Sequence, residues 1–252
     1  MKLKKTKLAL MALLMASSIG LSACGQKEEP KKDNTQTEQK KDETAKAQLM
    51  KGDELAKIEA DKKEKENYLV VDVRSPEEYK EGHVKFAINM PIDNFEKEIP
   101  TIDGFKNKNV VVYCNSGKKS AKAAEMLTKD GFTKVFDAEG VKKFKYDLVT
   151  YTNLLGPEFA KDIKDGKAKF IIDARKDADF KKGTFEGAVN IMPDDFEAKK
   201  DKLPKDKNEA IYVFCYSGNK SSKVAGMLTK DGYTNVFNAI DGSKEYDYGF
   251  NK

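Results

Sequence analysis

Short apolar runs alternate with amphipathic stretches along most of the chain. Continuous or nearly continuous apolar runs occupy residues 68–73, 110–113, 170–173 and 211–214, and such runs predict strands that are buried on both faces. Between them lie stretches with helical spacing, such as 53–59, where Leu55 and Ile58 are three residues apart. Strands without alternation that are separated by helices predict an α/β fold, a parallel sheet flanked by helices on both faces.

The body of the chain is a repeat. Its landmarks recur at a fixed offset of 101 residues, which separates Asp72 from Asp173 and also Cys114 from Cys215. A fixed offset between several landmarks is the sequence signature of a duplicated domain. The sequence therefore predicts two tandem domains, at residues 48–149 and 150–252.

The N-terminal residues have another pattern. Residues 1–23 carry four lysines, then an apolar run at 8–16, then small residues, which are the three parts of a secretory signal peptide. The apolar run is too short to span a bilayer as a stable helix. The stretch Leu21-Ser22-Ala23-Cys24 resembles the lipobox of bacterial lipoproteins, and this resemblance implies cleavage before Cys24 and a lipid on its sulfur. We expect an extracytoplasmic protein that is lipid-anchored to a bacterial membrane, with a plain signal peptide as the alternative.

Residues 24–47 follow as a charged tether. They are mostly Lys, Glu, Asp, Gln and Thr, and such a stretch buries too little apolar surface to offset the entropy of ordering, so we expect it to be disordered. The whole chain has a formal net charge of +5, and removal of residues 1–23 takes away four lysines and no acid, which leaves +1. The basic balance belongs largely to the leader and gives no indication of nucleic-acid binding.

Two seven-residue stretches carry the candidate chemistry. Residues 114–120 read Cys-Asn-Ser-Gly-Lys-Lys-Ser and residues 215–221 read Cys-Tyr-Ser-Gly-Asn-Lys-Ser, each between an apolar run and a helical pattern. A loop that leads from a strand into a helix surrounds its first side chain with unpaired N–H groups and the positive end of the helix dipole. This setting favours a thiolate. We therefore expect Cys114 and Cys215 to be reactive.

The other residues of these loops have predicted roles too. We expect the N–H groups of residues 115–119 and 216–220 to surround the sulfur, and the lysines to attract a small anionic donor. Ser120 and Ser221 are expected at the start of a helix, where the hydroxyl caps the helix or bonds the sulfur. The predicted substrate-binding loops comprise Asn115, Ser116, Gly117, Lys118, Lys119 and Ser120, and Tyr216, Ser217, Gly218, Asn219, Lys220 and Ser221.

Three motifs together resemble the rhodanese family of sulfurtransferases. They are Asp72-Val73-Arg74, the segment from Glu81-Gly82-His83-Val84 to Ala87-Ile88-Asn89-Met90-Pro91, and Cys-x-x-Gly-x-Lys-Ser at 114. The resemblance covers residues 48–252 as two modules. It implies an enzyme without a cofactor that moves sulfane sulfur, from a donor of the thiosulfate or polysulfide type, to a thiol or cyanide through a persulfide on Cys114 or Cys215.

Loop length and loop composition qualify this resemblance. Both loops span six residues, from Cys114 to Lys119 and from Cys215 to Lys220. In this family six-residue loops accompany sulfur chemistry, whereas a longer loop accommodates phosphate. Many active members carry arginine where Lys119 and Lys220 stand; lysine keeps the charge but loses the planar fork, so the identity of the donor stays open.

Residues outside the loops have supporting roles in this interpretation. His83, the only histidine, stands where the second copy has Thr184, and we expect it to pack rather than to act as a base. Four residues, Asp72, Arg74, Asp173 and Arg175, are expected to brace the strand ends, with contact between an arginine and the substrate as the alternative.

Several alternatives stay open. A disulfide between Cys114 and Cys215 would suit an oxidising compartment, provided that their Cα atoms lie within about 7 Å. A metal site is disfavoured, because one histidine and two distant cysteines lack zinc-like spacing. Instead of an enzyme, the chain could be a sulfur-binding or thiol-redox relay that delivers persulfide to an unknown partner protein, or a scaffold without catalysis.

Overall fold

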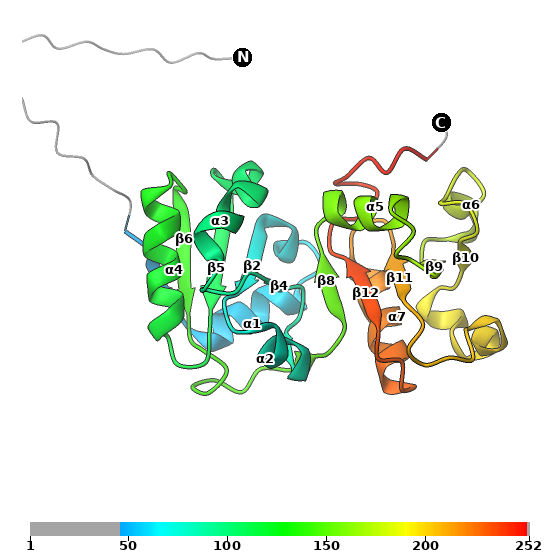
Figure 1. Ribbon diagram of the computed structural model, residues 1–252, viewed down its shortest axis with the longest axis horizontal. Coiled ribbons are helices and arrows are strands. Elements are labelled where there is room, and N and C mark those ends of the chain that lie inside the picture. Colours follow the sequence, from blue (N-terminus) through cyan, green and yellow to red (C-terminus); the bar gives the residue numbers. More distant parts are fainter. Residues whose placement is uncertain (1–45, 251–252) are drawn as a thin grey trace, which may run out of the picture. The chain divides into compact units, whose positions relative to one another are not determined.

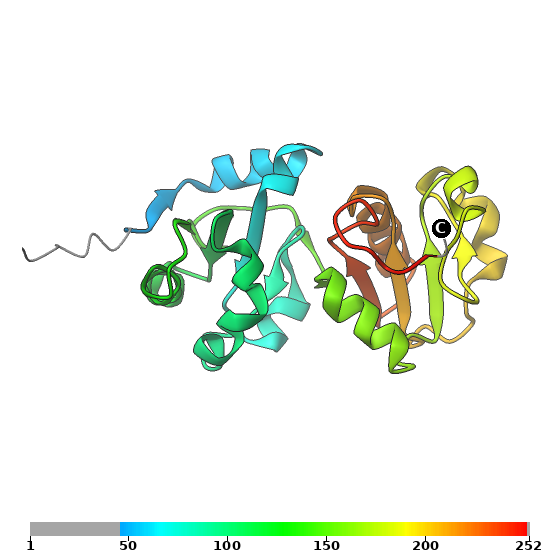
Figure 2. The same ribbon diagram turned by 90° about the horizontal axis from the view of Figure 1, so that it is seen from above.

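The computed structural model describes residues 46–250, which contain two five-stranded sheets in succession along the chain (Figures 1 and 2). The predicted signal peptide, Cys24 and the tether up to residue 45 lie outside the described residues. Within residues 46–250, no helix has the length and apolar character needed to cross a membrane.

The first sheet is entirely parallel and has the order β1-β6-β5-β2-β4. The central strand β5 follows from its sequence, because its valines are buried on both faces of the sheet. The strands are β1 (Gln48–Met50), β2 (Tyr68–Asp72), β4 (Ile88–Asn89), β5 (Asn109–Tyr113) and β6 (Lys134–Ala138).

The second sheet repeats this arrangement, again with parallel pairs only, in the order β10-β9-β11-β12-β8. Its central strand β11 is buried along its whole length. The strands are β8 (Thr152–Leu154), β9 (Phe170–Asp173), β10 (Val189–Asn190), β11 (Ile211–Phe214) and β12 (Val236–Ala239). The predicted α/β fold with parallel sheets is confirmed.

Helices connect the strands. The α-helices of the first half are α1 (Gly52–Ala60), α2 (Pro76–Glu81), α3 (Phe95–Glu98) and α4 (Lys118–Lys129), and those of the second half are α5 (Gly156–Lys164), α6 (Asp177–Phe180) and α7 (Asn219–Lys230). Short 3-10 helices are η1 (Glu64–Asn67), η2 (Ile99–Phe105), η3 (Pro193–Asp195) and η4 (Glu197–Lys202). Proline stands in the first turn of α2 and α5, where its missing N–H costs no hydrogen bond.

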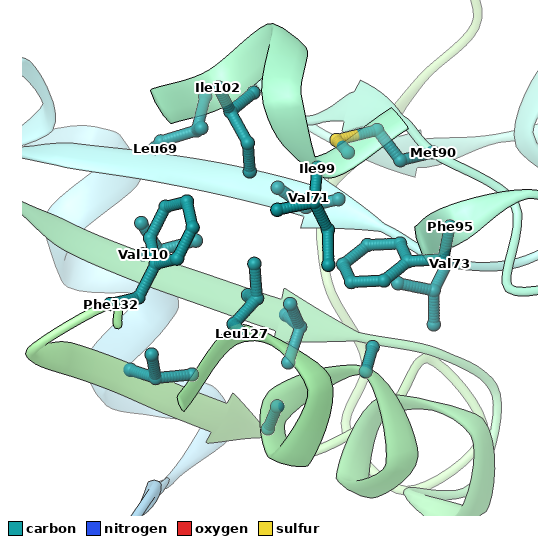
Figure 3. Packing of buried hydrophobic residues seen from close by; sticks show 14 of the residues in the cluster. Leu69, Val71, Val73, Met90, Phe95, Ile99, Ile102, Val110, Leu127 and Phe132 are labelled. Atoms are coloured by element: carbon teal, nitrogen blue, oxygen red, sulfur yellow. The ribbon is translucent and has the colours of Figure 1, made fainter. Parts of the chain in front are cut away.

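Alternate side chains of the central strands pack on opposite faces of the first sheet, which places helices on both faces. Leu69 and Val110 belong to one cluster with Leu127 of α4, shown in Figure 3. Val70 and Val111 point to the other face and pack with Leu55 of α1. Both faces of the first sheet are therefore buried, which explains why these strands lack the alternation of apolar and polar residues seen in a half-exposed sheet.

The chain passes from one half to the other near residue 150. Strand β7 (Leu148–Val149) pairs antiparallel with β3 (His83–Val84) of the first half, and β8 then starts the second sheet at Thr152. Asn153 of β8 ties the halves together, since its N–H donates to the hydroxyl oxygen of Tyr79 at 3.1 Å and its Nδ2 donates to the carbonyl oxygen of Ala87 at 2.9 Å.

Candidate active sites

Cys114 lies directly after the central strand β5, at the carboxyl end of the parallel sheet, where ligands bind in open α/β sheets. The chain turns at Gly117, whose φ of +99° is left-handed and therefore favours glycine. Helix α4 begins at the next residue, Lys118. The side chain of Cys114 is only 2% exposed, and it is free, as is Cys215, which removes the disulfide alternative.

The start of α4 differs from the prediction. We expected the helix to begin at Ser120, but Gly117 takes up the capping position and the helix starts two residues earlier. Ser120 is therefore inside the first turn, buried, and its hydroxyl does not cap the helix but donates to the carbonyl oxygen of Gly117 at 3.2 Å. The same hydroxyl lies 3.5 Å from the Sγ of Cys114.

Hydrogen bonds from the start of α4 stabilise the ionised form of Cys114. The N–H of Gly117 donates to the Sγ at 3.2 Å. Burial by itself would raise the pKa of the Cys114 thiol, but the hydroxyl of Ser120 and the N–H groups of Ser120, Ser116 and Gly117 outweigh it and lower this pKa below its ordinary value. The loop therefore favours the nucleophilic thiolate of Cys114.

The neighbouring helix α2 holds the first loop in place. The side-chain amide of Asn115 donates to Glu78 at 2.6 Å. Glu78 also forms a capping box with Ser75 at the start of α2. The amide of Asn115, followed by the N–H of Ser75, lowers the pKa of Glu78, so this carboxylate is a charged and fixed support for the loop.

The second loop follows the same path with fewer bonds. Cys215 is also 2% exposed, Gly218 is left-handed with a φ of +73°, and the Ser221 hydroxyl donates to the carbonyl oxygen of Gly218 at 3.1 Å. Helix α7 starts at Asn219, two residues before the predicted Ser221, which therefore does not cap it either. No donor in residues 46–250 forms a hydrogen bond to the Sγ of Cys215. Where the first loop has Asn115 the second has Tyr216, which is 57% exposed.

Two glycines that the sequence analysis missed lie under these loops. The N–H of Val141 donates to the carbonyl oxygen of Cys114, and the N–H of Ser243 donates to that of Cys215, both at 3.0 Å. This close approach needs a glycine just before each donor. A Cβ on Gly140 would lie 2.4 Å from the backbone oxygen of Cys114, and one on Gly242 would lie 2.0 Å from backbone atoms of Tyr216.

We predict that the alanine variants of these glycines act locally. Because a Cβ at Gly140 collides with backbone, Gly140→Ala should displace the first loop and slow alkylation of Cys114 roughly tenfold or more. Gly242→Ala should do the same for Cys215. Alkylation rates resolved by peptide mass spectrometry check this. Gly104→Ala is the control, since no atom lies within 4 Å of its Cβ position; an equal effect of all three variants would contradict the account.

The predicted strand-end residues form buried ion pairs. The guanidinium of Arg74 donates to the carboxylate of Asp72 from Nε at 3.0 Å and from a terminal nitrogen at 2.6 Å, and that terminal nitrogen also donates to the carbonyl oxygen of Gly82. Asp173 and Arg175 repeat this geometry with the carbonyl oxygen of Gly183. Each pair ties a strand end to the segment after the following helix.

Each aspartate also accepts a hydrogen bond from a hydroxyl group, which comes from a different residue in the two halves. In the first half, the hydroxyl of Tyr113 donates to Asp72 at 2.7 Å. The second half has Phe214 at the position of Tyr113, and there the hydroxyl of Thr184 donates to Asp173 at 3.0 Å. Both buried carboxylates are therefore satisfied, by different residues.

His83 occupies the position of Thr184 and is fully buried. Its ring stacks on Tyr79 with centroids 3.6 Å apart, its Nδ1 lies 3.0 Å from the carbonyl oxygen of Tyr79, and its Nε2 lies 3.4 Å from the side-chain nitrogen of Asn153. Burial lowers the pKa of His83 to about 3. His83 is therefore a neutral packing residue at the junction of the two halves.

This histidine should make stability depend on acid. Between pH 6.5 and about 3 the unfolded chain binds a proton on His83 that the folded chain does not bind, so the free energy of unfolding falls as the pH decreases through this window, by up to about 5 kcal/mol. Urea unfolding of the wild type and of His83→Gln at several pH values measures the slope. The variant should lose this part of the slope, and identical slopes would contradict the prediction.

A cleft of about 1010 Å³ reaches Cys215. Its cations come from both halves of the chain: Lys62 and Lys63 from the first, and Arg175, Lys176, Lys220, Lys223 and Lys244 from the second. A second cleft of about 640 Å³ lies beside the start of α4 and is lined by Lys118, Lys119, Lys97 and Lys122. Among residues 46–250, no three His, Cys, Asp or Glu side chains gather as a metal site.

The comparisons with known proteins decide the family. The model of the rhodanese-like domain matches residues 53–145 and 156–247. The chain belongs to the rhodanese-like family. Its two rhodanese-like domains and their sulfurtransferase relatives support sulfur transfer in general terms.

Three of the relatives each match a stretch of this chain no longer than one of its two domains. Thiosulfate sulfurtransferase PspE of Escherichia coli K12 is 44% identical over 72 residues, which are 29% of this chain and 69% of that protein. A tRNA uridine(34) hydroxylase of Yersinia enterocolitica is 38% identical over 76 residues, which span only 22% of its length. Among solved structures, a rhodanese with anions from E. coli is 40% identical and is covered to 98% by a third (33%) of this chain, with a TM-score of 0.31.

Proposed function

We propose that this protein is a sulfurtransferase that carries sulfane sulfur as a cysteine persulfide. The observation that supports this most is the setting of Cys114, whose Sγ accepts the N–H of Gly117 at 3.2 Å and lies 3.5 Å from the Ser120 hydroxyl at the start of α4. These bonds favour the thiolate, and the thiolate is the nucleophile in sulfur transfer.

The proposed reaction has two displacement steps. The cysteine thiolate attacks the outer sulfur of thiosulfate, the bond between the two sulfur atoms of the donor breaks, and sulfite leaves with the electron pair. The product on the enzyme is a persulfide anion. Cyanide or a thiolate then attacks its terminal sulfur, which leaves as thiocyanate or as a new persulfide and restores the cysteine thiolate. Lysines in the clefts beside the loops attract the anionic donor.

Formation of thiocyanate from thiosulfate and cyanide tests this proposal. Steady turnover is expected. Polysulfide is tested as a second donor, because Lys119 and Lys220 stand where many active members have arginine, which leaves the identity of the donor open. If neither donor gives thiocyanate above the uncatalysed rate, the enzyme proposal fails.

A relay that binds sulfur without turnover is the second candidate. The observation that favours it is the burial of both sulfur atoms, because a cysteine that is 2% exposed would hold its persulfide away from small acceptors. Rapid mixing separates the two candidates. A relay would take up one sulfur atom per cysteine and release almost no thiocyanate to cyanide, whereas an enzyme would form thiocyanate continuously.

We also propose that the protein is extracytoplasmic and anchored to a bacterial membrane through a lipid on Cys24. The support is the order of lysines, apolar run and small residues at 1–23, followed by Cys24. Labelling with a fatty acid analogue should mark the wild type in the membrane fraction. Cys24→Ser should lose the label, and a labelled variant would contradict the proposed anchor.

A further inference from the structure

Lys65 belongs to η1 of the first domain, but its ammonium group lies against the cysteine loop of the second. Its Nζ donates to the carbonyl oxygen of Ser217 at 2.5 Å and to that of Ile240 at 3.5 Å. The side chain is only 7% exposed, and its Nζ also lies 4.7 Å from the ring centroid of Phe86. A buried ammonium with these partners is fixed in place, so the first domain contributes a directed positive charge to the Cys215 loop.

The first domain has a cation of its own at the matching place. The Nζ of Lys143 lies 3.7 Å from the Cβ position of Gly117, the residue at the turn of the Cys114 loop. For the second loop, the Nζ of Lys65 lies 3.0 Å from the Cβ position of Gly218. Each turn therefore has an ammonium group next to its left-handed glycine.

The second domain does not supply this cation from the corresponding position. The N–H of Lys143 donates to the carbonyl oxygen of Gly140, and the N–H of Glu245 donates to that of Gly242, so Glu245 is the counterpart of Lys143. Glu245 is acidic and accepts a hydrogen bond from the N–H of Gly242 at 2.8 Å. Lys143, beside the first loop, thus corresponds to an acid in the second domain, and Lys65 from the other domain supplies the ammonium group beside Gly218.

Neighbours of Lys65 strengthen this contact between the domains. Glu66 forms an ion pair with Lys244 at 2.7 Å, and the side-chain amide of Asn219, the first residue of α7, donates to the carbonyl oxygen of Lys62 at 3.2 Å. Residues 62, 63, 66 and 67 line the cleft that reaches Cys215. By contrast, the cleft beside Lys118 is lined by residues of the first domain only.

We infer that Lys65 is a positioning residue for Cys215, which fixes the loop through Ser217 and places a positive charge near the thiolate and the later persulfide anion. The Cys215 site is then complete only when the two domains are docked. This inference rests on the proposed function for its role in sulfur transfer. Burial lowers the pKa of Lys65, and the negative charges of Glu245 and of ionised Cys215 oppose this change.

Alkylation of the full chain tests the inference without sulfur transfer. Rates for Cys114 and Cys215 are measured in the same sample by peptide mass spectrometry across a pH series. Lys65→Met and Lys65→Gln should slow alkylation of Cys215 at neutral pH about tenfold, because they remove the positive charge that holds the loop in place. Cys114 should keep its wild-type rate and midpoint in both variants and thus reports on folding.

The set of variants gives each outcome a meaning. Lys65→Gln keeps a hydrogen-bond donor without the charge, and it carries the test alone if Lys65→Met does not fold. Lys65→Arg should restore most of the Cys215 rate, and Lys143→Met should leave that rate unchanged. Unaltered Cys215 rates, or equal slowing of both cysteines, would overturn the role of Lys65. Because alkylation needs no sulfur donor, a failed thiocyanate assay would count against the proposed function alone.

Discussion

Replacing both Cys114 and Cys215 with serine will reduce thiocyanate formation at least about a thousandfold, because the proposed nucleophile is lost from both domains. A serine hydroxyl is not ionised at neutral pH and cannot form a persulfide. Initial rates with saturating thiosulfate and cyanide measure the effect. The substitution exchanges one sulfur atom for a smaller oxygen atom in each loop, so both domains should still fold.

The single variants divide the activity between the domains. Since the two loops lie in separate sheets, the rates that remain in Cys114→Ser and in Cys215→Ser should add up to the wild-type rate. Cys24→Ser is the matched control and should retain full activity. A double variant that keeps a large part of the wild-type rate would show that neither cysteine carries the sulfur.

Asp72→Asn will cost about 3–5 kcal/mol of unfolding free energy, because it removes one partner of a buried ion pair and leaves the other charge uncompensated. The carboxylate of Asp72 is fully buried and accepts hydrogen bonds from the Arg74 guanidinium, the Arg74 N–H and the Tyr113 hydroxyl. Urea unfolding followed by circular dichroism measures the loss. Asp173→Asn should have a similar effect in the second domain.

An exposed ion pair provides the control for this substitution. Asp53 and Lys57 pair at 2.7 Å on the surface of α1, where both side chains are largely exposed. Pairs of this kind contribute little to stability, so Asp53→Asn should leave the unfolding midpoint unchanged. Equal losses for Asp72→Asn and Asp53→Asn would mean that the buried pair does not brace the strand end.

The sequence was sufficient for the features that local pattern determines. The central strands β5 and β11 have uninterrupted apolar residues, and their order with respect to the helices predicts a parallel sheet. The repeat placed Cys114 and Cys215 at equivalent strand ends, and both are found there. These predictions succeeded because strand burial and duplication are visible in the residues themselves.

Edge strands and the exact helix start were not predictable in this way. Strand β1 has three residues, of which Leu49 is 87% exposed, so it lacks the apolar run of a buried strand. Its pairing with β6 is decided by the sheet rather than by its own sequence. Similarly, helix α4 begins at Lys118 because Gly117 adopts a left-handed conformation that leads directly into the helix, whereas Ser120 looked like the better cap by composition.

Contacts between the domains have no local signal at all. Lys65 and Ser217 are 152 residues apart, and nothing around Lys65 distinguishes it from the other lysines of this charged segment. The counterpart of Lys143 was also hidden, because one extra residue in the second domain changes the offset from 101 to 102 between Gly140 and Gly242. Only the matching backbone hydrogen bonds reveal which residues correspond.

The central claim is that Cys114, ionised by the N–H groups and the hydroxyl around it, accepts one sulfur atom from a sulfane donor. The most direct measurement is the mass of the peptide that contains Cys114 after exposure of the protein to thiosulfate and removal of the donor. We predict a gain of about 32 Da, one sulfur atom on the cysteine, that cyanide then reverses. An unchanged peptide mass, with polysulfide as well as with thiosulfate, would contradict the claim.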